Sequence, residues 1–431
     1  MLLSYLHRYA ARKADFPNHP RDSPRRARRL LDRLGAPERS LPIVHVIGTK
    51  GKGSTCAMVE SILRAAGRRT GLYTSPHLHS PRERIRLLGL PISRPAFAGG
   101  LRRLLPLLEE SLSWDDLGPA TLFEGLTALA LECFSRHGVE VAVVEAGMGG
   151  GSDATAALTP ILTLLTPVSL DHQAYLGETL AAIAAEKVGA VPRGGLVLSA
   201  PQPDEAWDVV LRRCREVGAV LRPVGPAHPA ELALAGRHQE INAGLALAAV
   251  EALREQGWAI PKEAVERGLR EVRWPGRLEV VAGRPLTLVD AAHNPAAAQA
   301  LAEALVLLFP RRPRLFLLGC SADKDLAGIV AALAPPADGA VATRAHHYRA
   351  ADPQALAALW HRHGVPTEVL PDVREALERA RRWAGPDGLV CACGSFFVVA
   401  EVREALGLAV REEWPEPAYA LRPAVEPLVV S

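Results

Sequence analysis

Short apolar runs alternate with helical patterns along most of the chain. The first run, over residues 43–47, ends in a glycine-rich turn, and helical spacing follows from Cys56 to Ala66. Further strands are predicted over residues 70–74, 85–90, 139–144 and 160–165, and helices over residues 95–111, 121–134 and 178–190. This alternation continues to about residue 272, and it predicts a mostly parallel sheet with helices on both faces.

The pattern breaks around Trp274 and then restarts. Later strands are predicted over residues 286–290, 314–318, 339–343, 368–370 and 389–393. We therefore predict an α/β protein with one domain over residues 1–275 and a smaller, Rossmann-like domain over residues 276–431. Residues 75–81 contain two prolines and two histidines and are predicted to form an exposed loop. The proline-rich tail after Trp414 is predicted to be extended.

Composition and charge exclude several classes of protein. The chain has 431 residues, 48% hydrophobic and 23% charged, which is typical of a globular protein with more than one core. A net charge of +3 is too small to indicate a large nucleic-acid surface, and the basic cluster at residues 25–29 is predicted to be a solvated helix face. No membrane span or signal peptide is predicted. The scattered cysteines predict a reducing cytoplasm.

The glycine-rich turn carries the strongest chemical signal. Its sequence is Gly48-Thr49-Lys50-Gly51-Lys52-Gly53-Ser54-Thr55. Backbone N–H groups in such a turn bind anions; Lys52 would reach the β- and γ-phosphates, and Ser54 or Thr55 would offer a hydroxyl to Mg²⁺. The usual P-loop pattern is incomplete, because Val46 replaces its first glycine and Gly53 follows the lysine. An ordinary glycine turn is therefore the alternative.

Polar residues also follow or lie near other strands. Glu145 ends a strand at a glycine-rich turn, where a carboxylate suits Mg²⁺ and a solvated side chain is the alternative. His172 ends another strand, and a structural histidine explains it equally well. His77 is by itself best explained as solvent-exposed. Lys187 lies on a largely apolar helix, where an amine can have a lowered pKa or extend to solvent.

Three polar segments follow strands of the predicted second domain, at residues 290–295, 319–325 and 393–395. They would share one sheet edge, where open α/β sheets bind ligands, and could form a second wall for a nucleotide. Helix capping is the alternative for each. No G-x-S-x-G elbow follows a strand, which disfavours a Ser-His-Asp hydrolase.

Taken in order, these stretches resemble the folylpolyglutamate synthase/dihydrofolate synthase family of the Mur ligase superfamily. The resemblance covers nearly the whole chain and rests on the glycine loop, Ser75-Pro76-His77-Leu78, residues 145–155, Asp171-His172, Glu186-Lys187, Gly236-Arg237-His238-Gln239, residues 276–279, residues 290–295 and Asp323-Lys324-Asp325. The Lys-Gly-Ser end of the loop is similar to the folate branch rather than the cell-wall branch.

The resemblance implies an N-terminal P-loop, Mur-ligase-like ATP-binding domain and a smaller C-terminal Rossmann-like ligase domain. It implies a cytoplasmic, monomeric amide ligase that uses ATP and Mg²⁺. A carboxylate of dihydropteroate or a folate would become an acyl phosphate, from which the amine of L-glutamate displaces phosphate. No nucleic-acid or membrane partner is expected.

The resemblance also implies roles for individual residues. The implied catalytic residues are Lys52, His172 and Lys187, the last matching a lysine that the family carbamylates. The implied Mg²⁺ ligands are Ser54, Ser75, Glu145, His172 and Lys187. The implied nucleotide-binding residues are Gly48, Thr49, Gly51, Lys52, Gly53, Ser54, Thr55, Asn242, Arg277, Asp290 and His293. The implied folate-binding residues are Ser75, His77 and Asp153.

The chain departs from the family pattern at four positions. Lys50 stands in place of a usual Asn, Gly151 and Ala156 in place of an Arg and an Asn, and Ala291 in place of a Gly. None of these four departures removes a residue that phosphoryl transfer needs. Two other functions are possible alternatives. The first is a Mur-type ligase acting on a UDP-muramoyl substrate, which the lack of an obvious additional N-terminal UDP-binding domain disfavours. The second is an ATP-binding regulatory protein without turnover.

Overall fold

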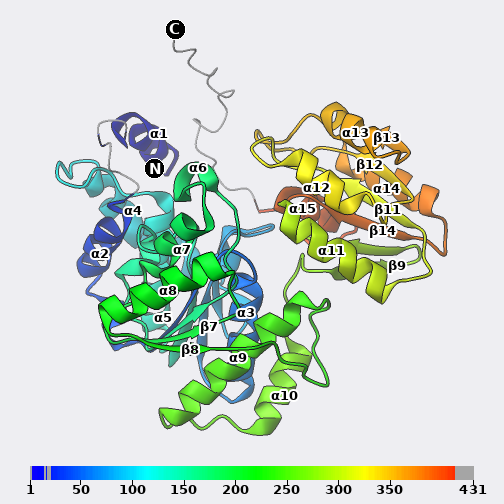
Figure 1. Cartoon of the computed structure of the whole chain (residues 1–431). Coiled ribbons are helices and arrows are strands. Elements are labelled where there is room, and N and C mark those ends of the chain that lie inside the picture. The colour runs from blue at the N-terminus through cyan, green and yellow to red at the C-terminus, as the bar shows by residue number, and fades with distance from the viewer. Residues whose placement is uncertain (1, 14–15, 17–20, 413–431) are drawn as a thin grey trace.

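The computed structural model describes residues 2–13, 16 and 21–412, which fold around two separate sheets (Figure 1). The predicted tail after Trp414 lies outside these residues. Within them, the first sheet has eight strands in the order β4-β3-β2-β5-β1-β6-β7-β8. The strands are β1 Ile43–Ile47, β2 Thr70–Tyr73, β3 Ile85–Leu87, β4 Leu90–Pro91, β5 Val141–Glu145, β6 Leu162–Leu165, β7 Leu196–Ser199 and β8 Val220–Pro223.

The first sheet is parallel from β2 to β8, and β3 and β4 run antiparallel at its edge. The helices around it are α1 Leu2–Arg12, α2 Ser23–Arg33, α3 Lys52–Ala65, α4 Arg94–Ser111, α5 Leu122–Arg136, α6 Gln173–Leu176, α7 Leu180–Val188, α8 Asp204–Val217, α9 His238–Glu255 and α10 Lys262–Glu271. We call this part the first domain.

Alternate residues of β1 explain why both faces of the first sheet are covered. Val44 and Val46 pack into one core with α3, α9 and α10. Ile43 packs on the opposite face with α2, α4 and α5, and Ile47 packs with α7 and α8. Because successive strand residues point to opposite faces, a strand that is apolar throughout must be buried on both.

The second domain begins after α10 and is built on a six-stranded sheet, counted over the described residues, in the order β13-β12-β11-β14-β10-β9. Its elements are β9 Glu279–Gly283, β10 Leu286–Val289, α11 Pro295–Leu308, β11 Arg314–Leu318, α12 Leu326–Leu333, β12 Gly339–Ala342, α13 Pro353–Arg362, β13 Thr367–Val369, α14 Val373–Ala384, β14 Leu389–Cys393 and α15 Phe396–Ala405. The strands are parallel except β9. The predicted α/β class with a second, smaller sheet is confirmed.

Three local predictions are wrong. The helix predicted from Cys56 begins at Lys52, because Gly51 adopts a left-handed conformation (φ 84°) that allows the next residues to form the first turn. The loop at residues 75–81 is not exposed as a whole, since His79 and Ser80 are 8% and 5% exposed. In the basic cluster, Arg26 is fully buried rather than solvated.

Across the part of the chain that the structure describes, none of the helices combines the length and apolar character that a membrane span requires.

Candidate functional site

The glycine loop joins β1 to α3 at the carboxyl edge of the first sheet. Gly48 and Gly51 have φ values of 128° and 84°, where side chains are strained. A Cβ atom would lie 2.1 Å from Thr166 Oγ1 at Gly48 and 2.1 Å from Asn242 Oδ1 at Gly51. Both positions therefore require glycine. The loop keeps its shape through the N–H groups of Thr49 and residue 50, each of which donates to the carbonyl of residue 167 at 3.2 Å.

A cavity of about 320 Å³ lies against this loop and reaches the second domain. Seven residues with an implied nucleotide role line it: Thr49, Gly51, Ser54, Asn242, Arg277, Asp290 and His293. Gly48, Lys52, Gly53 and Thr55 do not line it. The structure thus brings the glycine loop, α9 and the carboxyl edge of the second sheet to one cavity.

The second-domain wall of this cavity is fixed by backbone contacts. Asp290 accepts hydrogen bonds from the N–H groups of Leu278 and Ala292, both at 2.8 Å. His293 Nδ1 donates to the carbonyl of Ala291 at 2.8 Å, which directs Nε2 toward the first domain. The pKa of His293 is lowered by burial. Asp290 and His293 therefore each hold a defined orientation.

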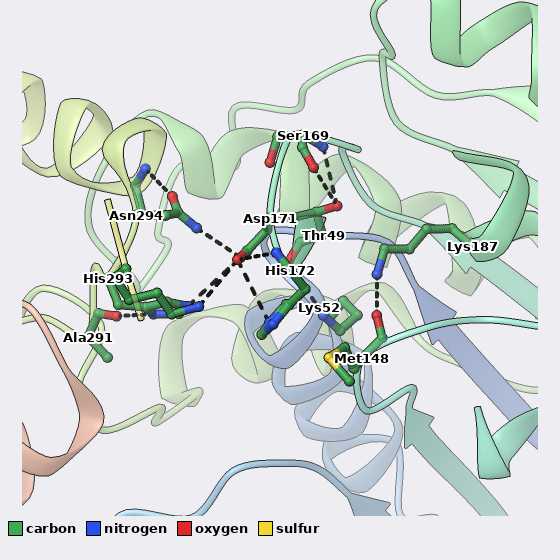
Figure 2. Close-up of polar contacts among 12 residues, drawn as sticks. Thr49, Lys52, Met148, Ser169, Asp171, His172, Lys187, Ala291, His293 and Asn294 are labelled. Atoms are coloured by element: carbon green, nitrogen blue, oxygen red, sulfur yellow. Dashed lines mark hydrogen bonds and ion pairs between the residues drawn. The ribbon is translucent and has the colours of Figure 1, made fainter. Parts of the chain in front are cut away.

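Asp171, in the segment after β6, joins the two domains beside the cavity (Figure 2). Its carboxylate accepts a hydrogen bond from Asn294 Nδ2 at 3.0 Å and pairs with Lys324 Nζ at 3.4 Å. It also accepts the backbone N–H of His172 at 2.9 Å, and His293 Nε2 lies 4.0 Å away. Burial alone would raise the pKa of Asp171, but His172, Lys324 and His293 lower it overall.

Asp171 has no assigned role in the sequence-based prediction. Its position beside His172 was the available signal, but its partners lie 123 and 153 residues away in the chain.

A second, much larger cavity of about 1760 Å³ is lined by residues of the segments that follow β2, β5 and β6. Ser75, Asp153 and His172 line it, together with Phe123 and Arg84. His77 lines neither cavity. Its Nδ1 instead accepts a hydrogen bond from Arg84 Nε at 2.9 Å, and burial, followed by Arg84, lowers the pKa of His77 to about 3.

The carboxylate of Asp153 organises the loop at this cavity. Its Oδ1 accepts from the backbone N–H and the hydroxyl of Thr155 at 3.0 and 2.7 Å, and its Oδ2 accepts from the N–H of Met148 at 3.0 Å. Because the Thr155 hydroxyl donates to Asp153, it can accept from Nε2 of the buried His45, 2.9 Å away. Asp153 therefore shapes the cavity wall as well as facing it.

Lys187 lies on α7 and is 2% exposed. Its Nζ donates to the carbonyl of Met148, as Figure 2 shows, and within the described residues it forms no ion pair with a carboxylate. Burial, followed by the nearby charge of Lys52, lowers the pKa of Lys187 to about 7. The surrounding fold therefore makes this amine neutral over part of the physiological pH range.

A small cavity at Glu145 lies next to both larger ones. Its lining shares Ser75 with the 1760 Å³ cavity and Arg277 with the 320 Å³ cavity. Glu145, 6% exposed at the end of β5, accepts the N–H of Ser75 at 3.1 Å. Burial raises the pKa of Glu145, and Lys52 opposes that effect. A buried carboxylate thus lies where the contents of the two cavities would meet.

The residues around Glu145 fit a magnesium ion. No group of three or more His, Cys, Asp and Glu side chains suited to a metal gathers anywhere in the described ranges. Mg²⁺, however, is usually held by one or two carboxylates together with phosphates and water. Glu145 and the Ser54 hydroxyl are hard oxygen donors. Ser54 lies in the first turn of α3 and lines the 320 Å³ cavity. His172, with a side chain 38% exposed, is a less typical ligand for this ion.

Comparison with known proteins gives concordant results. A protein-family model described as "Mur ligase, glutamate ligase domain" matches residues 276–396. The chain is 40% identical over 366 residues to the "Dihydrofolate synthase/folylpolyglutamate synthase" of Mycobacterium tuberculosis, covering 76% of this chain and 75% of that protein.

Two further relatives extend the comparison. A "Probable bifunctional folylpolyglutamate synthase/dihydropteroate synthase" of Haloferax volcanii is 37% identical over 410 residues, covering 89% of this chain; the chain spans 48% of that protein, about half its length. Among solved structures, Escherichia coli FolC in complex with DHPP and ADP aligns with a TM-score of 0.83 at 28% identity, covering 94% of this chain and 97% of that one.

Proposed function

Because the chain belongs to the folylpolyglutamate synthase/dihydrofolate synthase family, whose members are ATP-dependent ligases that add glutamate to folates, we propose that it carries out this ligation in the cleft between its domains. The observation that carries the proposal is the small cavity at Glu145, which shares lining residues with the cavity at the glycine loop and with the large cavity. A γ-phosphoryl group entering from one side and a carboxylate entering from the other would meet there.

The 320 Å³ cavity would hold ATP. Thr49, Gly51 and Ser54 of the glycine loop line this cavity and would contact the phosphates, and Lys52, beside the cavity at the start of α3, would supply a positive charge. Asn242, Arg277, Asp290 and His293 would contact the rest of the nucleotide. The relative from Escherichia coli was solved in complex with ADP, which supports nucleotide binding by this chain.

The oxygens of Glu145 and Ser54 would hold Mg²⁺, with Ser75 and His172 as further implied ligands. When bound, this ion neutralises charge on the transferring phosphoryl group. Burial disfavours the charged form of Glu145 and raises its pKa despite the charge of Lys52, so a further cation beside this carboxylate would favour its charged form.

The chemistry proceeds in two steps. An oxygen of the substrate carboxylate forms a bond to the γ-phosphorus while the bond to the β–γ bridging oxygen breaks, which releases ADP and leaves an acyl phosphate. The neutral amine of L-glutamate then attacks the acyl carbon, the bond from that carbon to the phosphate oxygen breaks, and the amine's proton leaves with the phosphate as the amide forms. Lys52 would stabilise the developing charge on the phosphates, and the second domain would exclude water from the acyl phosphate.

We further propose that Lys187 is carbamylated. Its neutral amine can form a bond to the carbon of CO₂ and lose a proton, which turns a buried cation into an anion with two oxygens. The anion would supply oxygen ligands for a second Mg²⁺. An arginine could not take this role, because it stays protonated.

The large cavity would hold the pterin and its glutamate chain, with Ser75 and Asp153 on its wall. His77 is turned toward Arg84, so a folate contact would require that hydrogen bond to break. The substitutions at Gly151 and Ala156 lie beside Asp153 in the sequence and would influence which folates fit.

One chain supplies both walls of the cleft, which supports a monomer as the active form. The six cysteines are buried thiols, which suits a reducing cytoplasm.

The experiment that tests the function measures phosphate release from MgATP and L-glutamate with dihydropteroate, with tetrahydrofolate and with no acceptor. Release with dihydropteroate establishes the dihydrofolate-forming reaction, and release with tetrahydrofolate establishes chain extension. We expect both, since the name of the Mycobacterium tuberculosis relative includes both activities. No acceptor-dependent release with either compound would contradict the proposal.

A further inference from the structure

The chain crosses back to the first domain after its last helix. Residues 406–412, which we call the C-terminal strap, follow α15 and end against the segment between β2 and β4. The backbone N–H of Glu412 donates to the carbonyl of His79 at 2.9 Å. The two ends of this contact are more than 300 residues apart in the chain and belong to different domains.

The side chain of Glu412 makes the principal contact of the strap. Its two carboxylate oxygens accept from Arg82 Nε at 2.9 Å and from Arg82 Nη2 at 2.6 Å. One oxygen also accepts from Arg94 Nε at 2.9 Å, and the other from the Ser80 hydroxyl. Hydrogen bonds from Arg82, then from Ser80 and Arg94, lower the pKa of Glu412 to about 2. The carboxylate is therefore charged at every pH at which the protein would work.

Beyond Leu406, which packs against the second-domain core, apolar burial contributes little to holding the strap in place. Leu408 and Val410 are 48% and 84% exposed. A cavity of about 250 Å³ lies beneath the strap, lined by Ala409, Val410 and Glu412 on one side. The position of the strap therefore depends on the polar contacts of Glu412 rather than on a packed core.

Two residues just before the strap reinforce the same junction. His79 Nδ1 donates to Glu404 Oε1 at 3.0 Å, and Arg403 Nε donates to His79 Nε2 at 3.3 Å. Arg403 is in turn paired with Glu279 at the start of β9. His79 is thus held between two side chains of α15.

The segment that the strap contacts is internally rigid and reaches the reaction site. The carboxylate of Glu83 accepts the N–H groups of residues 78, 79 and 80 at 3.0, 2.9 and 2.9 Å. Leu78 packs against the second-domain core around Val399. At the other end, the N–H of Ser75 donates to Glu145. A displacement at Ser80 would therefore be transmitted to the cavity at Glu145.

We propose that the C-terminal strap fixes residues 75–84 against the second domain, and that Glu412 is a positioning residue for the ligation site. The link to catalysis rests on the function proposed above, whereas the link to loop order does not. In the absence of Glu412's charge, residues 75–84 would keep the contacts of His79 with α15 but lose those that the strap adds at Ser80 and Arg82, and Ser75 would hold Glu145 and the folate less well.

The decisive variant is Glu412→Gln, which removes the charge but keeps the shape and the backbone N–H. The matched control is Glu255→Gln, which removes an exposed carboxylate that pairs with Arg222 at 2.7 Å within the first domain. Hydrogen exchange is measured on the full chain without substrates. We expect amides in residues 75–84 and 406–412 to exchange at least tenfold faster in Glu412→Gln, and at the wild-type rate in Glu255→Gln.

The kinetic readout separates positioning from general damage. In Glu412→Gln we expect the KM for the folate substrate to rise at least fivefold, with kcat reduced less than twofold and the urea midpoint close to wild type. Glu412→Asp, which keeps the charge, should recover part of the change. Adding Arg82→Gln to Glu412→Gln should add only the loss of the 2.7 Å hydrogen bond from Arg82 Nη1 to the carbonyl of Ile92, since the other contacts of Arg82 go to Glu412.

If hydrogen exchange in residues 75–84 is unchanged in Glu412→Gln, the strap does not fix this segment, whatever the ligase activity of the variant. Faster exchange with an unchanged KM would overturn its role in positioning the site. If the wild-type protein shows no ligase activity, the proposed function fails while the exchange experiment still decides whether the strap exists.

Discussion

The carboxylate of Asp171 in the first domain accepts a hydrogen bond of 3.0 Å from the side-chain amide of Asn294 in the second. The same carboxylate pairs with Lys324 at 3.4 Å, and its side chain is 10% exposed. This contact lies on the wall of the cavity proposed for ATP. Domain closure over the nucleotide should therefore depend on it.

Replacing Asp171 with Asn should weaken nucleotide binding. The substitution keeps the size of the side chain but leaves the charge of Lys324 unbalanced, which we expect to cost about 1–2 kcal/mol. That corresponds to roughly a 5- to 30-fold rise in the Kd for ADP. Isothermal titration with ADP checks this value. Asp208→Asn, at an exposed position on α8, is the control and should bind ADP normally.

Replacing Lys52 with Ala should impair both ATP binding and phosphoryl transfer. Lys52 begins α3, and its Nζ lies 3.4 Å from the carbonyl of Thr49, so the amine stays beside the glycine loop. We expect at least a tenfold loss in kcat/KM for ATP. Lys262→Ala removes an amine that is 83% exposed and should be neutral. Unchanged kinetics in Lys52→Ala would show that the loop is not the phosphate site.

Replacing Lys187 with Arg should abolish turnover and leave the fold intact. The guanidinium keeps a positive charge but cannot take up CO₂. Phosphate release with saturating substrates measures turnover, and far-UV circular dichroism checks the fold. In wild-type protein, ¹³C-labelled CO₂ should give a carbamate signal that is missing in Lys187→Arg. A variant with near-normal activity would refute the carbamate.

Activation by CO₂ should depend on pH with a midpoint near the pKa of Lys187, about 7. Below this value the amine is protonated and cannot react; about a tenth is neutral one pH unit below the midpoint and about nine tenths one unit above. Protein freed of CO₂ and Mg²⁺ should therefore recover activity faster at pH 8 than at pH 6 when both are added back. A recovery rate independent of pH would contradict a buried amine with a lowered pKa.

Residues close together in the sequence were predictable, and contacts between distant segments were not. The strand, the glycine loop and the helix after it follow from a local pattern, although the helix begins at Lys52 rather than at Cys56, and so does the polar edge at Asp290 and His293. By contrast, the contact of Asp171 with Asn294 spans 123 residues and leaves no periodic signal. Helical spacing also misled the prediction for Arg26, since periodicity identifies a charged face but not the partner that buries it.

That partner supports a last prediction. Arg26 Nε and Nη2 donate to the two carboxylate oxygens of Glu124 at 2.9 and 2.8 Å, and both side chains are fully buried. Glu124→Gln would remove the carboxylate that pairs with this buried guanidinium. We expect it to lower the free energy of unfolding by about 3–5 kcal/mol, because one partner of a buried ion pair is then uncompensated.

Urea unfolding followed by circular dichroism measures this loss. The double variant Arg26→Met with Glu124→Leu removes both charges and should recover most of the lost stability. If the pair had a purely steric role, the double variant would be less stable than Glu124→Gln. Glu255→Gln, at a pair whose side chains are 46% and 56% exposed, should cost no more than about 1 kcal/mol. A loss in Glu124→Gln as small as in this control would show that the buried charge of Arg26 is compensated elsewhere.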